Sequence, residues 1–379
     1  MRGRLITAGG AVLCAALWSA APASASATWQ VQAVPSPTNS AAQLQGVSCP
    51  TTGICIAVGY SADKTTFAEQ TLAERWTGGQ WSIQPAPSPG VGGVDQFTGV
   101  SCLSATDCTA VGIDSTSTAT NSTLAEHWDG TSWTVEPSPD PAGTTVTDLV
   151  GVSCASPASC TATGLYDKTT GGSAHEVPLA EHWNGSGWTV QAAPLPAGAI
   201  AADLDGGVSC PSATECTAVG SWTGPSQTGG PLVESWNGIK WQVQPTPALP
   251  AGAYNPFFAS VSCTSARHCT AVGGYLNGNV EESLVERWDG TSWTIQADAA
   301  PAGAAMDSVS CTSSASCTAV GGGEAEHWDG TSWTLQPPMP IPHHATRGVA
   351  VPSVSCRSAI TCTAVGFYGR QAHPLAEHE

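Results

Sequence analysis

Short segments in which apolar residues are interspersed with polar or small ones recur along the chain, and four kinds follow one another in a fixed order. The first kind ends in Val-Ser-Cys, as at 152–154, and the second begins Cys-Thr-Ala-Val-Gly, as at 216–220. The third reads Leu-Ala-Glu-His-Trp at 124–128 and the fourth Trp-Thr-Val at 133–135. Proline-rich stretches such as 85–89 end the set, because proline cannot continue a central strand. Each set predicts four short β-strands, and the chain is predicted to be all-β.

Paired cysteines show how often this set repeats. Apart from Cys14, the cysteines form seven pairs with five intervening residues each, and the first cysteines of successive pairs are 45 to 56 residues apart. That interval is typical of a four-stranded propeller blade. Zinc and redox motifs use shorter spacings, so we expect local disulfides that join the first and second strands, each worth about 2 kcal/mol at most. The predicted disulfides are Cys49/Cys55, Cys102/Cys108, Cys154/Cys160, Cys210/Cys216, Cys263/Cys269, Cys311/Cys317 and Cys356/Cys362.

A turn joins the third and fourth strands of most units. It reads Asp-Gly or Asn-Gly, as at Asp129-Gly130 and Asn184-Gly185. These dipeptides are preferred where both central residues of a hairpin turn need positive φ. The pattern therefore predicts a tight hairpin of that kind.

The two ends of the chain complement each other. The last unit stops after its third strand, at 375–378, and a segment that matches the fourth strand stands at the N-terminus, at 29–37. A linear array has no reason to be divided in this way, whereas a ring closed by both termini removes the open sheet edge. We therefore predict a seven-bladed β-propeller of four-stranded antiparallel blades, closed by pairing of the N-terminal strand with the C-terminal blade.

The repeat resembles the kelch-type propellers. The resemblance rests on Gly-Gly at 273–274 and 321–322, a downstream tryptophan, and the inter-blade segment 333–340, and it covers nearly all of 28–379. The chain departs from that family in its cysteine pairs and in lacking the usual tyrosine of the second strand. Its Asp-Gly turn also looks like the Asp-box of sialidase propellers, without the residue between Asp and Gly. Neither resemblance implies an activity, because propellers support many functions.

The N-terminus predicts export from the cell. Two arginines precede an apolar stretch over 5–21, and Ala-Ser-Ala at 25–27 is typical of a cleavage site. We expect 1–27 to be a signal peptide and 28–379 to be a single propeller domain, secreted and extracellular. No later segment has the continuous apolar length of a membrane span.

Charge and composition limit the partners. The net charge is −18 with 11 Lys and Arg residues in total, which disfavours nucleic acid because phosphates would be repelled. No nucleophile motif, phosphate loop or EF-type calcium loop stands out. His343, His344 and Arg347 form the nearest approach to a cluster, and adjacent histidines of an extended segment point apart. We therefore expect no cofactor, no metal and a monomer.

Features present in every unit predict architecture rather than chemistry. The paired tryptophans are expected to fill the spaces between blades. The glutamate of the third strand is expected to be structural or solvated, because an acid/base pair needs two carboxylates in different environments. Symmetry would place the neighbouring histidines on separate blades, which disfavours a shared metal. These glutamates are Glu74, Glu126, Glu181, Glu234, Glu286, Glu326 and Glu377.

Breaks in the repeat lie mostly in the loops between second and third strands and between units, which emerge on one face of a four-stranded propeller. Variable loops on a rigid scaffold are where binding is usual. The candidate ligand residues are Tyr60, Tyr166, Trp222, Tyr275 and Tyr368, just after the second strands, Tyr254, Phe257 and Phe258 before the fifth unit, and the hydrogen-bonding residues Asp63, Asp114, Asp167, Asn277 and Arg370. These aromatic rings could stack on sugar rings or could cap the blade ends.

Two functions remain open. The first is a secreted, non-catalytic binding module that recognises an extracellular glycan or protein through this aromatic face. The second is a secreted glycoside hydrolase or polysaccharide lyase that uses acidic residues near a central channel. The carboxylates considered for the second function are Asp63, Asp167, Asp203, Asp205 and Glu324.

Overall fold

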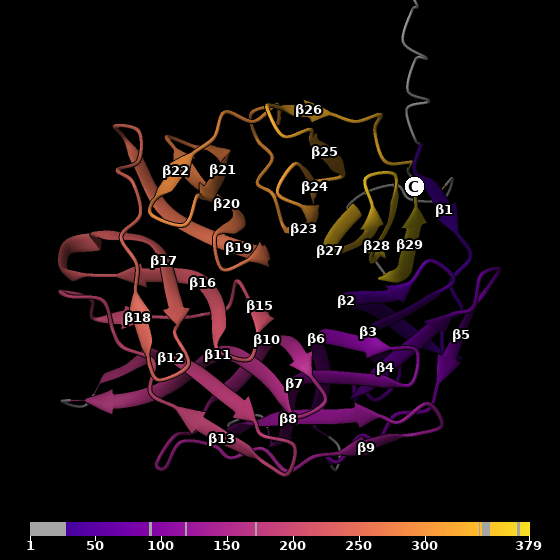
Figure 1. Cartoon of the computed structure of the whole chain (residues 1–379). Coiled ribbons are helices and arrows are strands. Elements are labelled where there is room, and N and C mark those ends of the chain that lie inside the picture. The colour runs from indigo at the N-terminus through magenta and orange to yellow at the C-terminus, as the bar shows by residue number, and fades with distance from the viewer. Residues whose placement is uncertain are drawn as a thin grey trace, which may run out of the picture.

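The chain folds into antiparallel sheets, mostly of four strands, that are arranged around a central opening (Figure 1). The computed structural model describes residues 28–90, 93–117, 120–170, 173–340, 342, 349–369 and 372–379. The predicted signal peptide, His343, His344, Arg347 and Arg370 lie outside these residues. The all-β class predicted from the sequence is confirmed, with propeller-like sheets.

Each unit consists of consecutive strands. The strands of the first half are β1 (Gln30–Gln32), β2 (Ser40–Thr51), β3 (Ile54–Asp63), β4 (Glu69–Trp76), β5 (Trp81–Gln84), β6 (Val94–Ser104), β7 (Asp107–Ser117), β8 (Thr120–Trp128), β9 (Trp133–Val135), β10 (Thr147–Ser156), β11 (Ser159–Thr170), β12 (Ser173–Trp183) and β13 (Trp188–Gln191). The strands of the second half are β14 (Ala201–Ala202), β15 (Val208–Ser212), β16 (Glu215–Thr223), β17 (Gly229–Trp236), β18 (Trp241–Val243), β19 (Ala253–Ser265), β20 (His268–Asn277), β21 (Val280–Trp288), β22 (Trp293–Ile295), β23 (Ser308–Ser313), β24 (Ser316–Gly321), β25 (Glu324–Trp328), β26 (Trp333–Leu335), β27 (Val349–Ser358), β28 (Thr361–Tyr368) and β29 (His373–His378). A short 3₁₀ helix, η1 (Pro225–Gln227), interrupts the loop between β16 and β17.

The sheets repeat one order. Three four-stranded sheets follow the order of the chain, namely β10-β11-β12-β13, β19-β20-β21-β22 and β23-β24-β25-β26. In a further sheet β14 and β15 both pair with β16, and the order continues through β17 to β18. A single parallel pairing, Glu69 with Val94, joins the two sheets formed by β2 to β5 and by β6 to β9.

Disulfides connect the first hairpin of every unit. In the β10–β11 hairpin, for example, the two bonded cysteines are cross-strand partners. The cysteine prediction is confirmed, because all seven expected pairs are bonded. The disulfides are Cys49–Cys55, Cys102–Cys108, Cys154–Cys160, Cys210–Cys216, Cys263–Cys269, Cys311–Cys317 and Cys356–Cys362.

The second cysteine of every pair is buried between neighbouring units, which the sequence did not show. The cysteine spacing predicts the bonds but does not distinguish the two sulfur atoms of a pair. In the structure the second cysteines are at most 4% exposed, and each belongs to a hydrophobic core cluster. They therefore belong to the core and cannot contact a ligand. These buried cysteines are Cys55, Cys108, Cys160, Cys216, Cys269, Cys317 and Cys362.

The turn after the third strand is a hairpin of a different type from the one predicted. Gly130 has φ of 96°, but Asp129 is not among the residues with positive φ. The Asp129 carboxylate instead accepts hydrogen bonds from the backbone N–H groups of Thr131 and Ser132, at 2.8 and 2.9 Å. The aspartate therefore stabilises a four-residue loop between Trp128 and Trp133, in which only the glycine requires the left-handed region.

The two termini share one sheet. In Figure 1 the indigo strand β1 lies beside the yellow strand β29, and the sheet order is β1-β29-β28-β27. The pairing is antiparallel and places Val31 opposite Glu377. The divided repeat predicts this pairing, and the closed ring of seven blades remains a prediction.

The same hydrogen bond links each unit to the next. The backbone N–H of the first cysteine of a unit donates to the hydroxyl of the serine that precedes the first cysteine of the unit before it. These bonds of 2.9 to 3.1 Å are Cys102 to Ser48, Cys154 to Ser101, Cys210 to Ser153, Cys263 to Ser209, Cys311 to Ser262, Cys356 to Ser310 and Cys49 to Ser355. The last of them joins the C-terminal unit to the first one.

The hydrophobic core lies between neighbouring sheets. In one cluster Ala180 of β12 packs with Leu204, Ala218 and Trp241 of the following unit. Trp241 is 3% exposed. The prediction that the tryptophans fill the spaces between units agrees with this packing.

The glutamates of the third strands are buried in the same layers. All of them, including Glu234 and Glu181, have no exposed surface. Glu181 accepts a 2.5 Å hydrogen bond from Ser138 of the preceding unit, whereas both carboxyl oxygens of Glu234 have no partner among the described residues. Burial raises the pKa of Glu234 to about 8. Because these carboxyls are fully buried, their role is structural, and the alternative of a solvated role is wrong.

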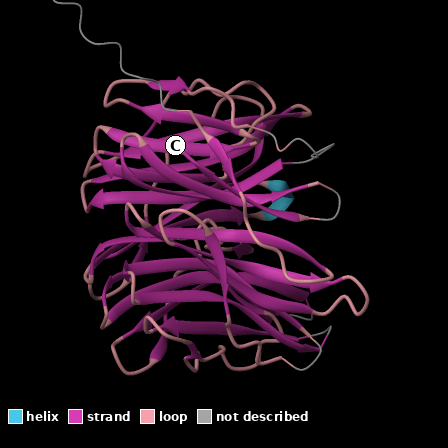
Figure 2. Cartoon of the chain, turned by 90° about the vertical axis from the view of Figure 1, so that its right-hand side faces the viewer, coloured by secondary structure: helices cyan, strands magenta, loops and turns pink. Residues whose placement is uncertain are grey.

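The two faces of the molecule carry different connections. Because the strands run up and down, the disulfide hairpins and Asp-Gly turns emerge on one face and the second-to-third and unit-to-unit loops on the other. We call them the disulfide face and the loop face. Figure 2 shows the strands crossing the molecule between the two faces, with η1 beside the right-hand loops.

Candidate functional site

Three of the predicted aromatic residues meet at one place on the loop face. Trp222 at the end of β16 and Tyr254 and Phe257 at the start of β19 line a hollow of about 680 Å³. An adjoining hollow of about 420 Å³ extends it along β17. The residues common to both are Trp222, Thr228, Gly229, Tyr254, Asn255 and Pro256. We call the two hollows together the aromatic groove.

Glycines allow the Trp222 ring to lie against the backbone of β17. Trp222 and Gly230 are cross-strand partners. A Cβ added at Gly230 would lie 2.7 Å from Trp222 Nε1 and 3.2 Å from Cε2, and one at Gly224 would lie 3.2 Å from Cζ3. Real side chains would collide at such distances, so only glycine permits this contact. The indole is half-buried against its own unit and borders the groove.

The loops of this face hold unusual backbone conformations. The non-glycine residues with positive φ in the described segments are Asn39, Phe67, Ser226, Asn255 and Ala372, and all belong to loop-face connections or their edges. Ser226, at φ 61°, and Asn255, at φ 48°, both line the groove. Such conformations cost about 1 to 3 kcal/mol each and are common at ligand sites.

The polar groups of the groove are neutral. Tyr254 is 41% exposed, and its hydroxyl donates to the carbonyl of Gly278 in the β20–β21 turn. Thr228 donates to Pro225 O at 2.8 Å, which fixes the loop around η1. No charged side chain is among the described residues that line either hollow. The groove therefore offers aromatic surface, hydroxyls and an amide.

Most of the other predicted aromatic residues pack against their own units. Tyr166, Tyr275 and Tyr368 are half-buried against the cores of three different units. Tyr60 follows its glycine by one residue rather than two, so its side chain points to the other side of its sheet. The structure does not bring these four tyrosines into the aromatic groove.

Phe258 has to be removed from the candidate ligand residues. It is fully buried, at 0% exposure, in a cluster with Val219 and Val261. Successive residues of a strand point to opposite sides, so Phe257 faces the groove and Phe258 the core. The sequence marked both residues because it showed an aromatic pair without showing the strand's register.

Two predicted hydrogen-bonding aspartates bind backbone N–H groups of loops within their own units, Asp167 in the connection before β10 and Asp63 in the turn after β3. The Asp167 carboxylate accepts from the backbone N–H groups of Thr145 and Val146, both at 2.8 Å. Asp63 accepts from Thr65 and Thr66 in the same manner. These hydrogen bonds lower the pKa of both carboxyls. They stabilise turns, and neither residue lines the groove.

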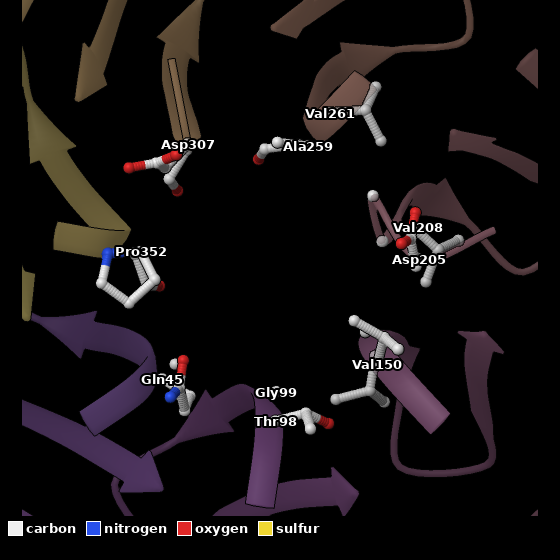
Figure 3. Close-up of a pocket in the computed structure, with 18 of the residues that line it drawn as sticks. Gln45, Thr98, Gly99, Val150, Asp205, Val208, Ala259, Val261, Asp307 and Pro352 are labelled. Carbon is white, nitrogen blue, oxygen red and sulfur yellow. The ribbon is translucent and has the colours of Figure 1, made fainter. Parts of the chain in front are cut away.

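A second cavity, of about 450 Å³, lies on the central axis (Figure 3). The first strands of the units line it, with Gln45, Thr98, Asp205 and Asp307 among its polar residues. Desolvation raises the pKa of Asp307 to about 6, and desolvation together with neighbouring Asp203 raises the pKa of Asp205. Asp205, proposed from the sequence, therefore faces this channel, whereas Asp307 was missed because nothing in its local sequence distinguishes it.

Asp203 and Glu324, two further carboxylates of the hydrolase hypothesis, do not line the central channel. Asp203 accepts hydrogen bonds from the N–H and hydroxyl of Ser221, at 2.9 and 2.7 Å. Glu324 is half-buried at the start of β25, and neither residue lines the channel. Within the described ranges, no group of three or more His, Cys, Asp or Glu residues is arranged to hold a metal ion.

Sequence reasoning also missed part of the groove itself. Ser226, Asn255 and Pro256 line it, although none is aromatic or charged. Ile200, 49% exposed, forms an apolar edge. The glycine pair 229–230 opposite Trp222 was the available signal, because glycine inside a strand often marks close approach of another group.

Comparison with protein families finds no match, and comparison with curated proteins finds none. Comparison with solved structures finds β-propellers. YCF48 bound to D1 peptide has a TM-score of 0.54 at 12% identity, covering 94% of this chain and 99% of that one. YCF48 from Cyanidioschyzon merolae has a TM-score of 0.55 at 12% identity, covering 93% of this chain and 98% of that one. A GH74 xyloglucanase from Xanthomonas campestris gives 0.55 at 12%, covering 90% of this chain and 53% of the other.

At such low identity the likeness concerns the fold alone. It supports the propeller class, and the kelch type remains a prediction. In the described part of the chain, no helix has the length and apolar character needed to cross a membrane.

Proposed function

We propose that this chain is a secreted, non-catalytic binding module. In this proposal it is a single seven-bladed propeller, closed by β1 and β29, and its ligand is an extracellular glycan or protein held in the aromatic groove. The observation that carries the proposal is the convergence of Trp222, Tyr254 and Phe257 on one hollow of the loop face. Concave sites lined by aromatic residues with a few neutral polar groups are typical of ligand sites.

The propeller neighbours are compatible with this role. One is described as bound to a peptide, and another is a xyloglucanase. They differ in activity, so the fold does not decide between binding and catalysis. The hydrolase hypothesis would require acidic groups at the bound substrate. The groove has none among its described lining residues, so a hydrolase would have to use the central channel, where Asp205 and Asp307 lie.

The proposal is tested by screening immobilised extracellular glycans and peptides with the secreted protein and with the double variant Trp222→Ala/Tyr254→Ala. We expect at least one ligand class to be bound and its binding to be lost in the double variant, while circular dichroism shows a folded protein. Binding that survives in a folded double variant would contradict the groove. Turnover of a bound polymer by the same preparation would contradict the non-catalytic role.

A further inference from the structure

We infer that the aromatic groove binds an uncharged glycan chain, with one sugar ring stacked on the accessible surface of Trp222. This inference rests on the proposed binding function and adds the chemical class of the ligand. Three observations support it: the glycine backbone lies against the Trp222 indole, several polar side chains of the groove make no hydrogen bond among the described residues, and the protein has a negative net charge.

The backbone that lies against the Trp222 indole holds the ring in a position that suits stacking of a sugar ring. Gly230 and Gly224 contact the ring closely enough that a methyl group at Gly230 would displace it. The backbone at these glycines therefore supports the indole, and Trp222 remains part of the groove wall. The C–H groups on one side of a hexose ring are weakly positive and pack on the negative face of an aromatic ring.

Unused hydrogen-bonding groups surround this ring. The side chains of Thr223, Ser226 and Asn255 make no side-chain hydrogen bond within the described residues, and all three line the groove. Ser226 and Asn255 are held at positive φ, so their positions are fixed by the loops rather than by each other. Hydroxyls and amides both donate and accept, which matches sugar hydroxyls because these also do both.

A proline-rich peptide fits these groups less well. Such a peptide in the polyproline II conformation presents carbonyl acceptors, and its prolines have no N–H to donate. The amide oxygen of Asn255 would then face the ligand without a donor. A sugar hydroxyl can supply this donor, so a glycan uses more of the groove's hydrogen-bonding groups than the peptide does.

The charge of the protein favours an uncharged glycan over an acidic one. The net charge is −18, and no lysine or arginine is among the described residues that line the groove. Uronic acids and sulfated sugars would be repelled without a compensating cation. The expected ligand is therefore built from neutral hexoses or N-acetylhexosamines.

The experiment measures binding of the secreted protein to a panel of cello-, manno-, laminari- and chito-hexaoses, with polygalacturonate and a decaproline peptide as comparison ligands. Calorimetry gives the affinity, and the part of the tryptophan fluorescence change that is absent in Trp222→Phe reports contact with the Trp222 indole, because the chain has 15 tryptophans. We expect at least one neutral hexaose to bind, and binding to be weakened about tenfold or more by Trp222→Ala. Trp222→Phe should retain part of the affinity, because a smaller flat ring remains.

Two groove variants are each paired with a control variant outside the groove, so that a loss of binding at the groove is distinguished from an effect of substitution in general. Gly230→Ala should weaken binding although it removes no aromatic group, because its methyl would meet Trp222 at 2.7 Å. Gly187→Ala is the control, because a Cβ there meets nothing within 4 Å. Phe67→Ala is the control for Trp222→Ala, because Phe67 is 78% exposed in another loop of the same face. Melting curves check that each variant is folded.

The outcomes distinguish this inference from the proposed function. If decaproline or polygalacturonate binds the wild-type protein and this binding is lost in Trp222→Ala, the inference of an uncharged glycan is overturned. The groove would then still be a binding site. Hexaose binding that is unchanged in folded Trp222→Ala and Gly230→Ala variants would overturn both the glycan inference and the groove as the binding site. Failure of every neutral hexaose to bind would overturn the inference alone.

Discussion

The disulfide face and the loop face are built from the same repeat, yet they differ in how strictly they follow it. On the disulfide face, every first hairpin carries a disulfide and most turns use the same aspartate or asparagine cap. On the loop face, connections differ in length and hold the non-glycine residues with positive φ. A contact repeated in every unit can stabilise the ring but cannot distinguish one position from another. The difference places stability in the repeated layers, and under the proposed function it places recognition in the loops around Trp222.

The largest expected effect comes from the repeated tryptophans. Trp241→Ala should lower the free energy of unfolding by about 3 to 5 kcal/mol, because Trp241 is only 3% exposed between two units. Trp222→Ala should cost about 1 to 2 kcal/mol, because that ring is half-buried. Denaturant unfolding of both variants measures the difference. Equal losses of unfolding free energy in the two variants would contradict the distinction between the repeated layers and the loop face.

The buried glutamates predict that alkaline conditions weaken the protein. Their folded pKa values, about 8 for Glu234 and about 7 for Glu181, lie above the value of the unfolded chain. Their contribution is therefore complete below pH of about 4.5. It falls as pH rises from there, by up to about 1.4 kcal/mol per pH unit for each fully buried group, and is lost once pH has passed the folded pKa of 7 to 8. Exposed turn aspartates such as Asp129, whose pKa is lowered, act in the opposite direction, and solvent screens them.

Glu234→Gln isolates this effect, because it preserves the shape of the side chain and removes the proton equilibrium. We expect a smaller fall in melting temperature between pH 6 and pH 9 than in the wild-type protein. Glu215→Gln, at an exposed position of the same unit, is the control and should follow the wild-type curve. If Glu234→Gln also follows that curve, Glu234 is not the alkaline-sensitive group.

Removing one disulfide should have an intermediate effect. The double variant Cys154→Ala/Cys160→Ala opens a loop with a sequence separation of 6 and buries no hydroxyl at the core position of Cys160. The expected loss from the opened loop is therefore about 2 kcal/mol, an upper value. Thermal unfolding under non-reducing conditions measures it. Affinity for a groove ligand should not change, and a weakened affinity would show that the two faces are coupled.

The smallest effect is expected at an aromatic residue that belongs to the loop face but not to the groove. Tyr275 packs, half-buried, on the core of its own unit. Tyr275→Ala should reduce stability by about 1 kcal/mol and leave ligand affinity unchanged. Calorimetric titration of this variant beside Trp222→Ala makes the comparison. Loss of affinity in Tyr275→Ala would extend the site beyond the groove.

The repeated elements could be predicted because each depends on local chemistry that recurs. Val-Ser-Cys, the cysteine spacing and Asp-Gly each specify a strand end, a disulfide or a turn within a few residues. The burial of Glu234 could not be predicted, because a carboxyl between sheets is revealed only by the packing of neighbouring units. The sequence placed the aromatic residues in the loop-face connections but did not show the directions of their side chains. Phe257 and Phe258 differ only in strand register, and Asn255 lines the groove through a backbone conformation that its sequence does not specify.

Hydrogen–deuterium exchange with and without the tightest-binding ligand of the screens tests the central claim most directly. If recognition lies in the loops and stability in the repeat, protection should appear at 221–230 and 253–257, the segments that form the aromatic groove. The disulfide hairpins should exchange equally in both states. Protection confined to the channel segments 205–208 and 307–309, or to the disulfide face, would contradict the account.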